Sequence, residues 1–269
     1  DRVLRTVVSH LESINLNKTD LDVKGVAFEQ FMDGFFKGDF GQYFTPRPII
    51  EFAVKMMKPE HDWDVLDPAC GSGGFLLHAL DYMRSQASEY YDKDTVDYFN
   101  YWHDFASKHL YGIEINDEIA RVAKMNMIVH DDGHTNVISF DALDSIDKMH
   151  DHNRGFEAGK FDLILTNPPF GSTITKAEKP YLANYELGKT KDAKGKYKDR
   201  PRQSSEILFI ERIWEFLKPG TGKAAIVLPD GVLTNSSAQY VRDFILEKFQ
   251  LLAAVSYTHL RAHETSAHL

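Results

Sequence analysis

Short apolar segments alternate with longer amphipathic segments along most of the chain. Five apolar segments are bounded by polar or turn residues and predict buried strands, at residues 63–67, 110–115, 137–140, 161–166 and 223–228. Apolar positions at helical spacing follow four of them and predict helices, at residues 75–83, 117–129, 205–217 and 236–249. A sixth strand is expected to start at residues 251–255. Apolar strands that alternate with helices indicate an α/β fold, with a mostly parallel sheet covered by helices on both faces.

The amino-terminal part reads differently, as two helical regions separated by a turn. Residues 1–40 have apolar positions at helix-like spacing. The turn at residues 41–48 leads into a helix that ends before Pro59. We expect Thr45 to cap this helix and Pro46 to lie just inside its start.

Two polar segments interrupt the alternation. Residues 85–108 are rich in Tyr, Asp and Ser and predict an insertion on the surface. Residues 172–203 contain seven Lys, two Arg and four acidic residues, a local net charge of +5. A solvated flexible loop is the plain interpretation of such a charge run, whereas contact with a polyanion is the functional one. The place of this segment, directly after the proline-rich motif described below, favours contact with a polyanion.

The composition is that of a folded domain with an acidic balance. Of the 269 residues, 43% are hydrophobic, which excludes disorder as the main state. The 31 basic and 40 acidic side chains give a net charge of −9, which argues against a protein that coats nucleic acid by charge alone. An enzyme that contacts DNA at one place remains compatible with this charge.

The cysteine content and the length of the apolar runs also indicate the compartment in which the protein works. The one cysteine, Cys70, excludes a disulfide scaffold and a multi-cysteine zinc site, and it fits a reducing cytoplasm. No apolar run reaches about 18 residues, so we expect no membrane span. We find no signal peptide, and because the first residue is Asp1 rather than Met, we expect a fragment of a longer protein.

A glycine-rich turn at residues 67–74 follows the first predicted strand. Ligands of open parallel sheets bind at the carboxyl ends of the strands, where glycines let the backbone approach them. Gly71 and Gly73 are followed by Leu76, so the third glycine of the dinucleotide fingerprint is missing. An acid at the end of the first strand and then Gly-x-Gly is the arrangement of an S-adenosylmethionine pocket, whose ammonium and sulfonium charges favour Asp67 as a partner. The alternative is a structural turn between a strand and a helix.

Acidic residues also end the second and third predicted strands. Glu114 can accept hydrogen bonds from both hydroxyls of a ribose. Asp117 is expected to cap the following helix. Asp141 lies where a side chain could accept from the adenine amino group of a cofactor, and a simple turn acid is the alternative.

The sharpest motif is Asn167-Pro168-Pro169-Phe170, which follows the fourth predicted strand. Two prolines fix an extended backbone and remove two N–H donors, so the carbonyls of Asn167 and Pro168 can face outward as acceptors. The Asn167 amide oxygen and a backbone carbonyl then form a pair of acceptors for an exocyclic NH2 group, and Phe170 offers a flat face for a base. The exocyclic nitrogen of adenine is a poor nucleophile, and two acceptors on its hydrogens stabilise the positive charge that develops during attack. A plain proline turn gives no reason for Asn167 and Phe170.

Four motifs occur in an order that identifies a family. They are Gly41-Gln42-Tyr43-Phe44-Thr45-Pro46-Arg47, Asp67-Pro68-Ala69-Cys70-Gly71-Ser72-Gly73-Gly74-Phe75-Leu76, Gly112-Ile113-Glu114-Ile115-Asn116 and Asn167-Pro168-Pro169-Phe170. From about residue 21 to about residue 255, the sequence resembles the modification (M) subunit of type I restriction–modification systems, a γ-class N6-adenine DNA methyltransferase. The resemblance implies a Rossmann-like, S-adenosylmethionine-dependent methyltransferase fold. It divides the chain into the end of an amino-terminal helical domain at residues 1–40, a catalytic domain at 41–255 and a tail outside the family at 256–269.

The resemblance also implies a role for each motif. The first motif would close over the methionine end of the cofactor, through Gln42, Tyr43, Phe44, Thr45, Pro46 and Arg47. Further cofactor contacts would come from Asp67, Gly71, Ser72, Gly73 and Gly74, and the ribose would be held by Glu114. A flipped-out adenine would be held by Asn167, Pro168, Pro169 and Phe170, because a base inside a duplex cannot reach such a pocket. The methyl group would pass directly from the sulfonium to N6.

In that family a separate specificity (S) subunit reads the DNA sequence, and two M subunits flank it. The resemblance therefore implies double-stranded DNA, an S subunit and a second M subunit as partners, with a restriction (R) subunit as a further one. After Val255 the chain departs from the family and reads as translated vector sequence. His259, His263 and His268 in this tail do not match a zinc-protease site, because Leu260 rather than Glu follows His259, and we expect no metal.

Four alternatives stay open from the sequence alone. A protein-glutamine methyltransferase also uses an Asn-Pro-Pro-aromatic motif, although the segment at residues 42–47 is not expected in it. A stand-alone or nuclease-fused adenine methyltransferase would have its target-recognition part outside this chain. A scaffold without activity would not need the motif residues intact. A nicotinamide enzyme would leave residues 167–170 unexplained.

Overall fold

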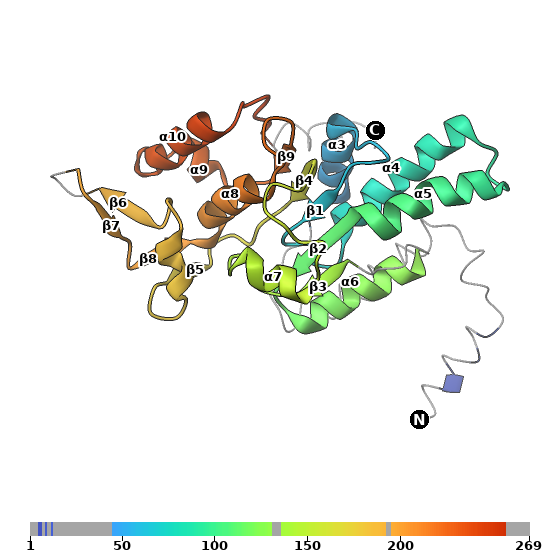
Figure 1. The fold of residues 1–269 in the computed structure, drawn as a ribbon, viewed down its shortest axis with the longest axis horizontal. Coiled ribbons are helices and arrows are strands. Elements are labelled where there is room, and N and C mark those ends of the chain that lie inside the picture. The colour runs from blue at the N-terminus through green and yellow to red at the C-terminus, as the bar shows by residue number, and fades with distance from the viewer. Residues whose placement is uncertain are drawn as a thin grey trace, which may run out of the picture.

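The computed structural model describes residues 45–130, 136–191 and 195–256, together with Arg5, Thr6, Ser9 and Glu12. Its centre is a parallel sheet of five strands in the order β3-β2-β1-β4-β9 (Figure 1). The strands are β1 (Val65–Asp67), β2 (Leu110–Glu114), β3 (Val137–Ser139), β4 (Leu163–Thr166) and β9 (Lys223–Ile226). All five lie within the segments that the apolar pattern predicts.

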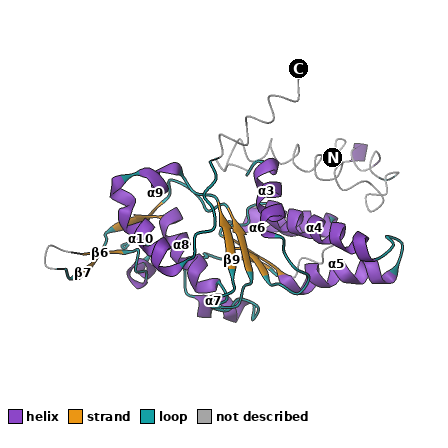
Figure 2. Ribbon diagram, turned by 90° about the horizontal axis from the view of Figure 1, so that it is seen from above, coloured by secondary structure: helices purple, strands orange, loops and turns teal. Residues whose placement is uncertain are grey.

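Helices cover both faces of the sheet, as predicted (Figure 2). On one face pack α3 (Arg47–Met57), α4 (Gly74–Tyr90), α5 (Val96–His109) and α6 (Asp117–Val129). On the other face pack α7 (Ile146–His152) and α8 (Ser205–Phe216). Successive residues of β4 alternate between the two cores, because Leu163 and Leu165 join the first cluster and Ile164 joins the second. The strands are therefore apolar on both sides, which is why they are visible in the sequence.

The carboxyl-terminal helices extend the second face. After β9 come α9 (Asp230–Thr234), the 3₁₀ turn η3 (Ser236–Ala238) and α10 (Gln239–Lys248). Val232, Val241 and Phe244 form a third apolar cluster with α8. Across the described ranges, no helix is long and apolar enough to cross a membrane.

The sixth strand is a wrong prediction. Residues 251–256 have no strand structure, and Leu251, Leu252 and Val255 are all more than half exposed. An apolar run favours burial, but it does not supply a neighbouring strand to pair with. The predicted domain limits at residues 40 and 256 stay predictions, since residues 13–44 and 257–269 lie outside the described part.

The surface insertion at residues 85–108 is also a wrong prediction. Helix α4 continues to Tyr90, and α5 returns beside it as an antiparallel partner. Trp102, Phe105 and Ala106 are buried in the first core at helical spacing. Abundant Tyr, Asp and Ser hide this apolar stripe, and the longest exposed stretch, residues 88–97, surrounds the tip between the two helices.

The basic segment is folded rather than a plain flexible loop. Two antiparallel ribbons pair β5 (Thr173–Thr175) with β8 (Arg202–Ser204) and β6 (Lys189–Lys191) with β7 (Tyr197–Asp199), and a 3₁₀ turn, η2 (Pro180–Asn184), lies between them. Lys176 Nζ lies 2.6 Å from Asp199 Oδ2 and ties the two ribbons together. We call this region, residues 172–191 and 195–204, the ribbon region.

Candidate functional site

The chemistry-bearing residues meet at the carboxyl ends of β1, β2, β3 and β4. The parallel register places Asp67 opposite Gly112 and Glu114 opposite Ser139, so the turns that follow these strands lie at one edge. Asn167 follows Thr166, the last residue of β4. The sheet therefore brings together three of the four motifs that the sequence singles out, as ligand sites in open α/β sheets require.

The glycine turn is held close to β2. Cys70 donates its backbone N–H to the carbonyl of Ile113 at 2.9 Å. Gly71 and Gly73 have φ angles of 53° and 90°, which side chains rarely adopt, so glycine is required there. A Cβ on Gly73 would meet the Met127 sulfur at 3.6 Å, an ordinary contact. Backbone conformation, more than crowding by the protein, therefore fixes this glycine.

Glu114 joins the glycine turn to the start of α6. Its Oε2 accepts from the Gly71 N–H at 3.1 Å, and its Oε1 accepts from the Asn116 N–H at 2.9 Å. Burial raises the pKa of Glu114, and these backbone donors oppose the shift. The predicted cap of α6 is wrong: the Asn116 side chain accepts from the Glu118 and Ile119 N–H groups, whereas Asp117 lies in the first turn.

Asp67 is a buried carboxyl group at the end of β1. Oδ1 accepts from Thr166 Oγ1 at 2.7 Å and from the Ala69 N–H at 3.0 Å. Burial raises the pKa of Asp67 to about 7, against the effect of these two donors. Within the described part of the chain no cation forms an ion pair with it. A positively charged ligand group at this point would restore the charged form.

The amide of Asn167 is held in one orientation by the segment that precedes α3. Its Nδ2 donates to Thr45 Oγ1 at 2.9 Å, across 122 positions of sequence. Its Oδ1 is buried and accepts no hydrogen bond from any residue that the structure describes. A buried acceptor without a donor is unfavourable by about 1–3 kcal/mol, so a ligand N–H at this atom would be stabilising. Thr45 therefore does not cap α3, whose N-cap residue is Pro46.

The rest of the motif is fixed on one side and open on the other. Ser205 Oγ, at the start of α8, donates to the Pro169 carbonyl at 2.8 Å. Pro168 is buried, whereas the Phe170 ring is 45% exposed. An exposed ring next to a buried acceptor suits a flat, polar-edged ligand such as a base.

Asp141, two residues after β3, accepts hydrogen bonds from three donors. Oδ1 accepts from the Leu143 N–H at 3.0 Å, and Oδ2 accepts from Lys179 Nζ at 2.9 Å and Tyr181 Oη at 2.8 Å. The neighbouring Phe140 N–H donates to the carbonyl of Glu114, which places Asp141 beside the second strand end.

The remaining predicted site residues lie at or just before the starts of helices, or outside the described part of the chain. Ser72 accepts at its carbonyl from Asn126 Nδ2 at 3.0 Å, Gly74 starts α4 against Ile50, and Arg47 starts α3. Gln42, Tyr43 and Phe44 lie outside the described residues. The sequence alone does not single out Thr166, Asn126, Lys179 and Tyr181, because nothing in their local pattern reveals partners that are distant along the chain.

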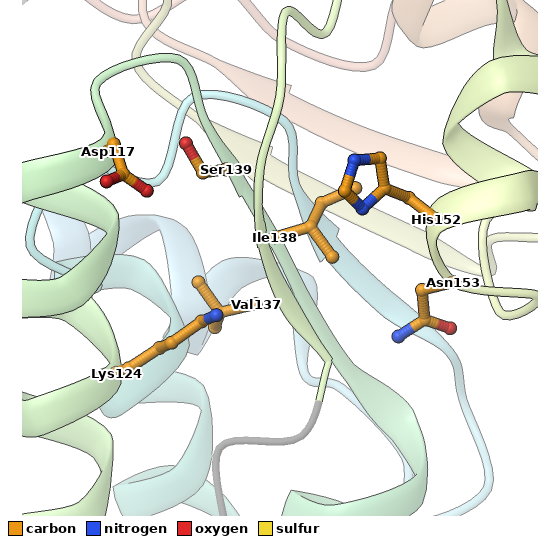
Figure 3. Close-up of a pocket in the computed structure, with 7 residues that line it drawn as sticks. All are labelled: Asp117, Lys124, Val137, Ile138, Ser139, His152 and Asn153. Atoms are coloured by element: carbon orange, nitrogen blue, oxygen red, sulfur yellow. The ribbon is translucent and has the colours of Figure 1, made fainter.

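An open groove of about 620 Å³ runs along the outer edge of β3 (Figure 3). Seven residues line it: Asp117, Lys124, Val137, Ile138, Ser139, His152 and Asn153. None of them is a predicted site residue. In the described ranges no group of three or more His, Cys, Asp or Glu side chains is placed to hold a metal ion.

The sheet order, the glycine turn and the acids at the strand ends define a Rossmann-like fold of the methyltransferase type. The model of the N-6 DNA Methylase family matches residues 19–259, and the chain belongs to this family. The type I restriction enzyme StySPI methylase subunit of Salmonella potsdam is 31% identical over 210 residues, 73% of this chain and 33% of that protein. The EcoEI methylase subunit of Escherichia coli is 30% identical over 240 residues, 86% of this chain and 41% of that protein.

A solved structure agrees with the sequence relatives. A modification subunit of a type I restriction enzyme from Vibrio vulnificus YJ016 superposes with a TM-score of 0.65 at 25% identity, over 90% of this chain and 46% of that one. The chain thus spans about a third to less than half of the length of these relatives.

Proposed function

We propose that this chain carries the catalytic centre of an N6-adenine DNA methyltransferase, working as the modification subunit of a type I restriction–modification complex. The observation that carries the proposal is the Asn167 amide. Its nitrogen is committed to Thr45, so its buried oxygen is presented as an acceptor that no described residue fills. An exocyclic NH2 group is the donor that the N6 atom of adenine supplies.

The motif residues act directly on the substrate nitrogen. Asn167 Oδ1 accepts one hydrogen of the adenine amino group, and the backbone carbonyl of Pro168 accepts the other. Phe170 stacks on the base, which has to leave the duplex to reach the strand ends. As N6 attacks, its positive charge grows and both acceptor bonds strengthen, so the transition state is stabilised more than the ground state. No base is required before the attack, and the surplus proton leaves N6 afterwards to water.

The residues at the sheet edge fit S-adenosylmethionine. Asp67 is a buried carboxyl group without a described cation partner, which the ammonium of the methionine part would provide. Each oxygen of Glu114 accepts one backbone N–H and can accept a second donor, which suits the two ribose hydroxyls. When bound, this cofactor supplies an electrophilic methyl group on sulfur.

The partners follow from the same proposal. The ribbon region offers cations to the DNA backbone, while the relatives' length beyond this chain leaves room for contacts with an S subunit, a second M subunit and an R subunit. In this proposal the S subunit recognises the DNA sequence, and this chain supplies the methyl-transfer centre.

The test combines binding and transfer. Calorimetric titration of the 269-residue chain with S-adenosylmethionine is expected to show micromolar affinity, and NAD is expected to give no heat. Addition of an S subunit and duplex DNA should then yield N6-methyladenine, detected by mass spectrometry of the digested DNA. Binding of NAD instead of S-adenosylmethionine, or methylation of cytosine or of protein glutamine, would contradict the proposal.

A further inference from the structure

The part of the ribbon region around η2 reaches across to the turn that follows β3. Lys179 Nζ and Tyr181 Oη both donate to Asp141 Oδ2, at 2.9 and 2.8 Å. Asp141 is shielded from solvent, with 17% of its side chain exposed, whereas Lys179 is 42% exposed. Burial and the Asp141 carboxylate raise the pKa of Tyr181 far above its usual value, so the phenol keeps its proton and remains a donor.

This connection is anchored on both sides. Tyr185 Oη donates to the Leu143 carbonyl at 2.7 Å, and Arg212 of α8 donates to the carbonyls of Leu143 and Asp144. The Glu211 carboxylate accepts from the backbone N–H groups of residues 186 and 187. The segment at residues 179–187 is therefore fixed to α8 and to the turn at residues 141–144 together.

The hydrogen-bonding capacity of Asp141 is almost filled. A carboxylate has about four acceptor positions, two on each oxygen. Oδ2 uses both of its positions for Lys179 and Tyr181, and Oδ1 uses one for the Leu143 N–H. One position on Oδ1 is left. Because three donors hold the group, this position has a fixed direction.

We propose that Lys179 and Tyr181 are positioning residues that hold Asp141 as a single directed acceptor for the adenine amino group of the cofactor. The inference rests on the proposed function. The two side chains do not touch the ligand: they prevent rotation of the carboxylate, so the ordering of the acceptor precedes ligand binding. Cofactor selection at the end of β3 thereby depends on residues of the ribbon region, which follows the Asn167 motif in the chain.

The test measures discrimination at the 6-position of the purine. S-adenosylhomocysteine and S-inosylhomocysteine differ there, since the second has an oxo group in place of the amino group. By calorimetry the wild-type chain is expected to prefer the adenosyl ligand by roughly tenfold or more, the effect of a hydrogen bond to a charged group. The double variant Lys179→Met, Tyr181→Phe is expected to lose most of this preference, as is the reference variant Asp141→Ala.

Two further variants separate positioning from folding. Lys176→Met removes a lysine of the same region that pairs with Asp199 instead, and the preference should stay at the wild-type value. Lys179→Met alone is the second test, for the case in which the double variant does not fold. Because Lys179 is partly exposed, this variant should fold, and it should lose part of the preference for the adenosyl ligand.

The outcomes are distinguishable. An unchanged preference in both Lys179 variants, or tighter binding of the adenosyl ligand by them, would overturn the inference while leaving the proposed function in place. Failure of the folded wild-type chain to bind S-adenosylhomocysteine would overturn both.

Discussion

Thr45 and Asn167 show how much a single hydrogen bond can decide. An asparagine amide can present either its oxygen or its nitrogen, and the two choices have opposite chemistry. In the structure Nδ2 donates to Thr45 Oγ1, which leaves the oxygen as the open atom. The sequence predicts that Asn167 is an acceptor, but it assigns Thr45 to a helix cap. The selection of the amide orientation is visible only in the fold.

Replacement of Asn167 by Ala tests its role as an acceptor. Methyl transfer by Asn167→Ala should fall by about 10²–10³-fold, the usual effect of removing one group that stabilises transition-state charge. S-adenosylmethionine affinity should stay nearly unchanged, because in the proposed function the amide contacts the substrate amino group and not the cofactor. Transfer is measured with radiolabelled cofactor, and affinity by calorimetry. Asn235→Ala, at an exposed asparagine, is the matched control and should change neither quantity. Equal reductions of binding and transfer in Asn167→Ala would refute the assigned role.

The titration of Asp67 should appear in the pH dependence of cofactor binding. The free protein has its Asp67 pKa raised from 3.8 to about 7, so the carboxyl group is mostly neutral below that pH. A bound ammonium favours the charged form, so affinity should rise by up to about tenfold per pH unit towards pH 7 and level off above it. Calorimetry across this range with Asp67→Asn as the control checks this, because the variant should bind weakly at every pH. A wild-type affinity that is flat with pH would speak against this role.

The same pKa shift affects the stability of the free protein. Because the folded pKa of Asp67 lies above its value in the unfolded chain, the folded state binds the proton more tightly between pH 3.8 and about 7. The contribution of this proton to the free energy of unfolding is largest below pH 3.8. It decreases as the pH rises and is lost above about pH 7. Asp67→Asn should remove this part of the pH dependence in thermal unfolding.

Among the helices and strands, predictability follows burial. Strands β1, β2 and β4 are buried throughout, so their apolar runs stand out in the sequence. Helix α6 also begins and ends where its periodicity predicts. Helix α5 is hidden in the sequence because its core side is a narrow apolar stripe among polar residues, and its burial depends on α4 rather than on the sheet alone.

The contrast between two phenylalanines of α5 tests this correction. Phe105 is fully buried, whereas Phe99 is 44% exposed. Phe105→Ala should lower the free energy of unfolding by about 3–5 kcal/mol, and Phe99→Ala by much less, because the first leaves a cavity in the core. Urea unfolding followed by circular dichroism measures both. If both variants lower the free energy of unfolding by similarly small amounts, residues 85–108 form a surface insertion, as the sequence predicts.

In the candidate site, too, some residues can be predicted from local sequence and others depend on contacts between distant segments. Asp67, Glu114 and Asn167 are predictable because strand ends and glycine or proline turns mark them in the sequence. Thr166 and Lys179 are not, because they act through partners 99 and 38 positions away. Such partners follow from strand order and from how the ribbon region folds back, and neither is encoded in a short motif.

For the molecule as a whole, charge is distributed unevenly. Residues 172–203 carry +5 of a total of −9, so the rest carries −14. The β6–β7 ribbon lies at one end of the long axis, and the acidic tip between α4 and α5, with Asp92 and Asp94, lies at the other (Figure 1). A polyanion would therefore meet favourable and unfavourable ends of the same domain.

Three exposed cations of the ribbon region test its interaction with DNA. Replacing Lys196, Lys198 and Arg202 by Gln should weaken DNA binding in the assembled complex and reduce the salt slope by about 1 for each phosphate that is no longer neutralised. Fluorescence anisotropy at several salt concentrations measures both. The control replaces Lys55, Lys58 and Lys93, exposed lysines outside the ribbon region, and matches the change in net charge. If both triple variants have the same slope, the ribbon region does not bind DNA.

With the basic β6–β7 ribbon at one end and the acidic tip at the other, the domain has an electric dipole component along its length (Figure 1). A dipole in the field of DNA experiences a torque before the two molecules touch, so in the proposed complex the ribbon end would turn towards the duplex during approach. Orientation would then be selected in the encounter itself, and salt would slow association more than it speeds release.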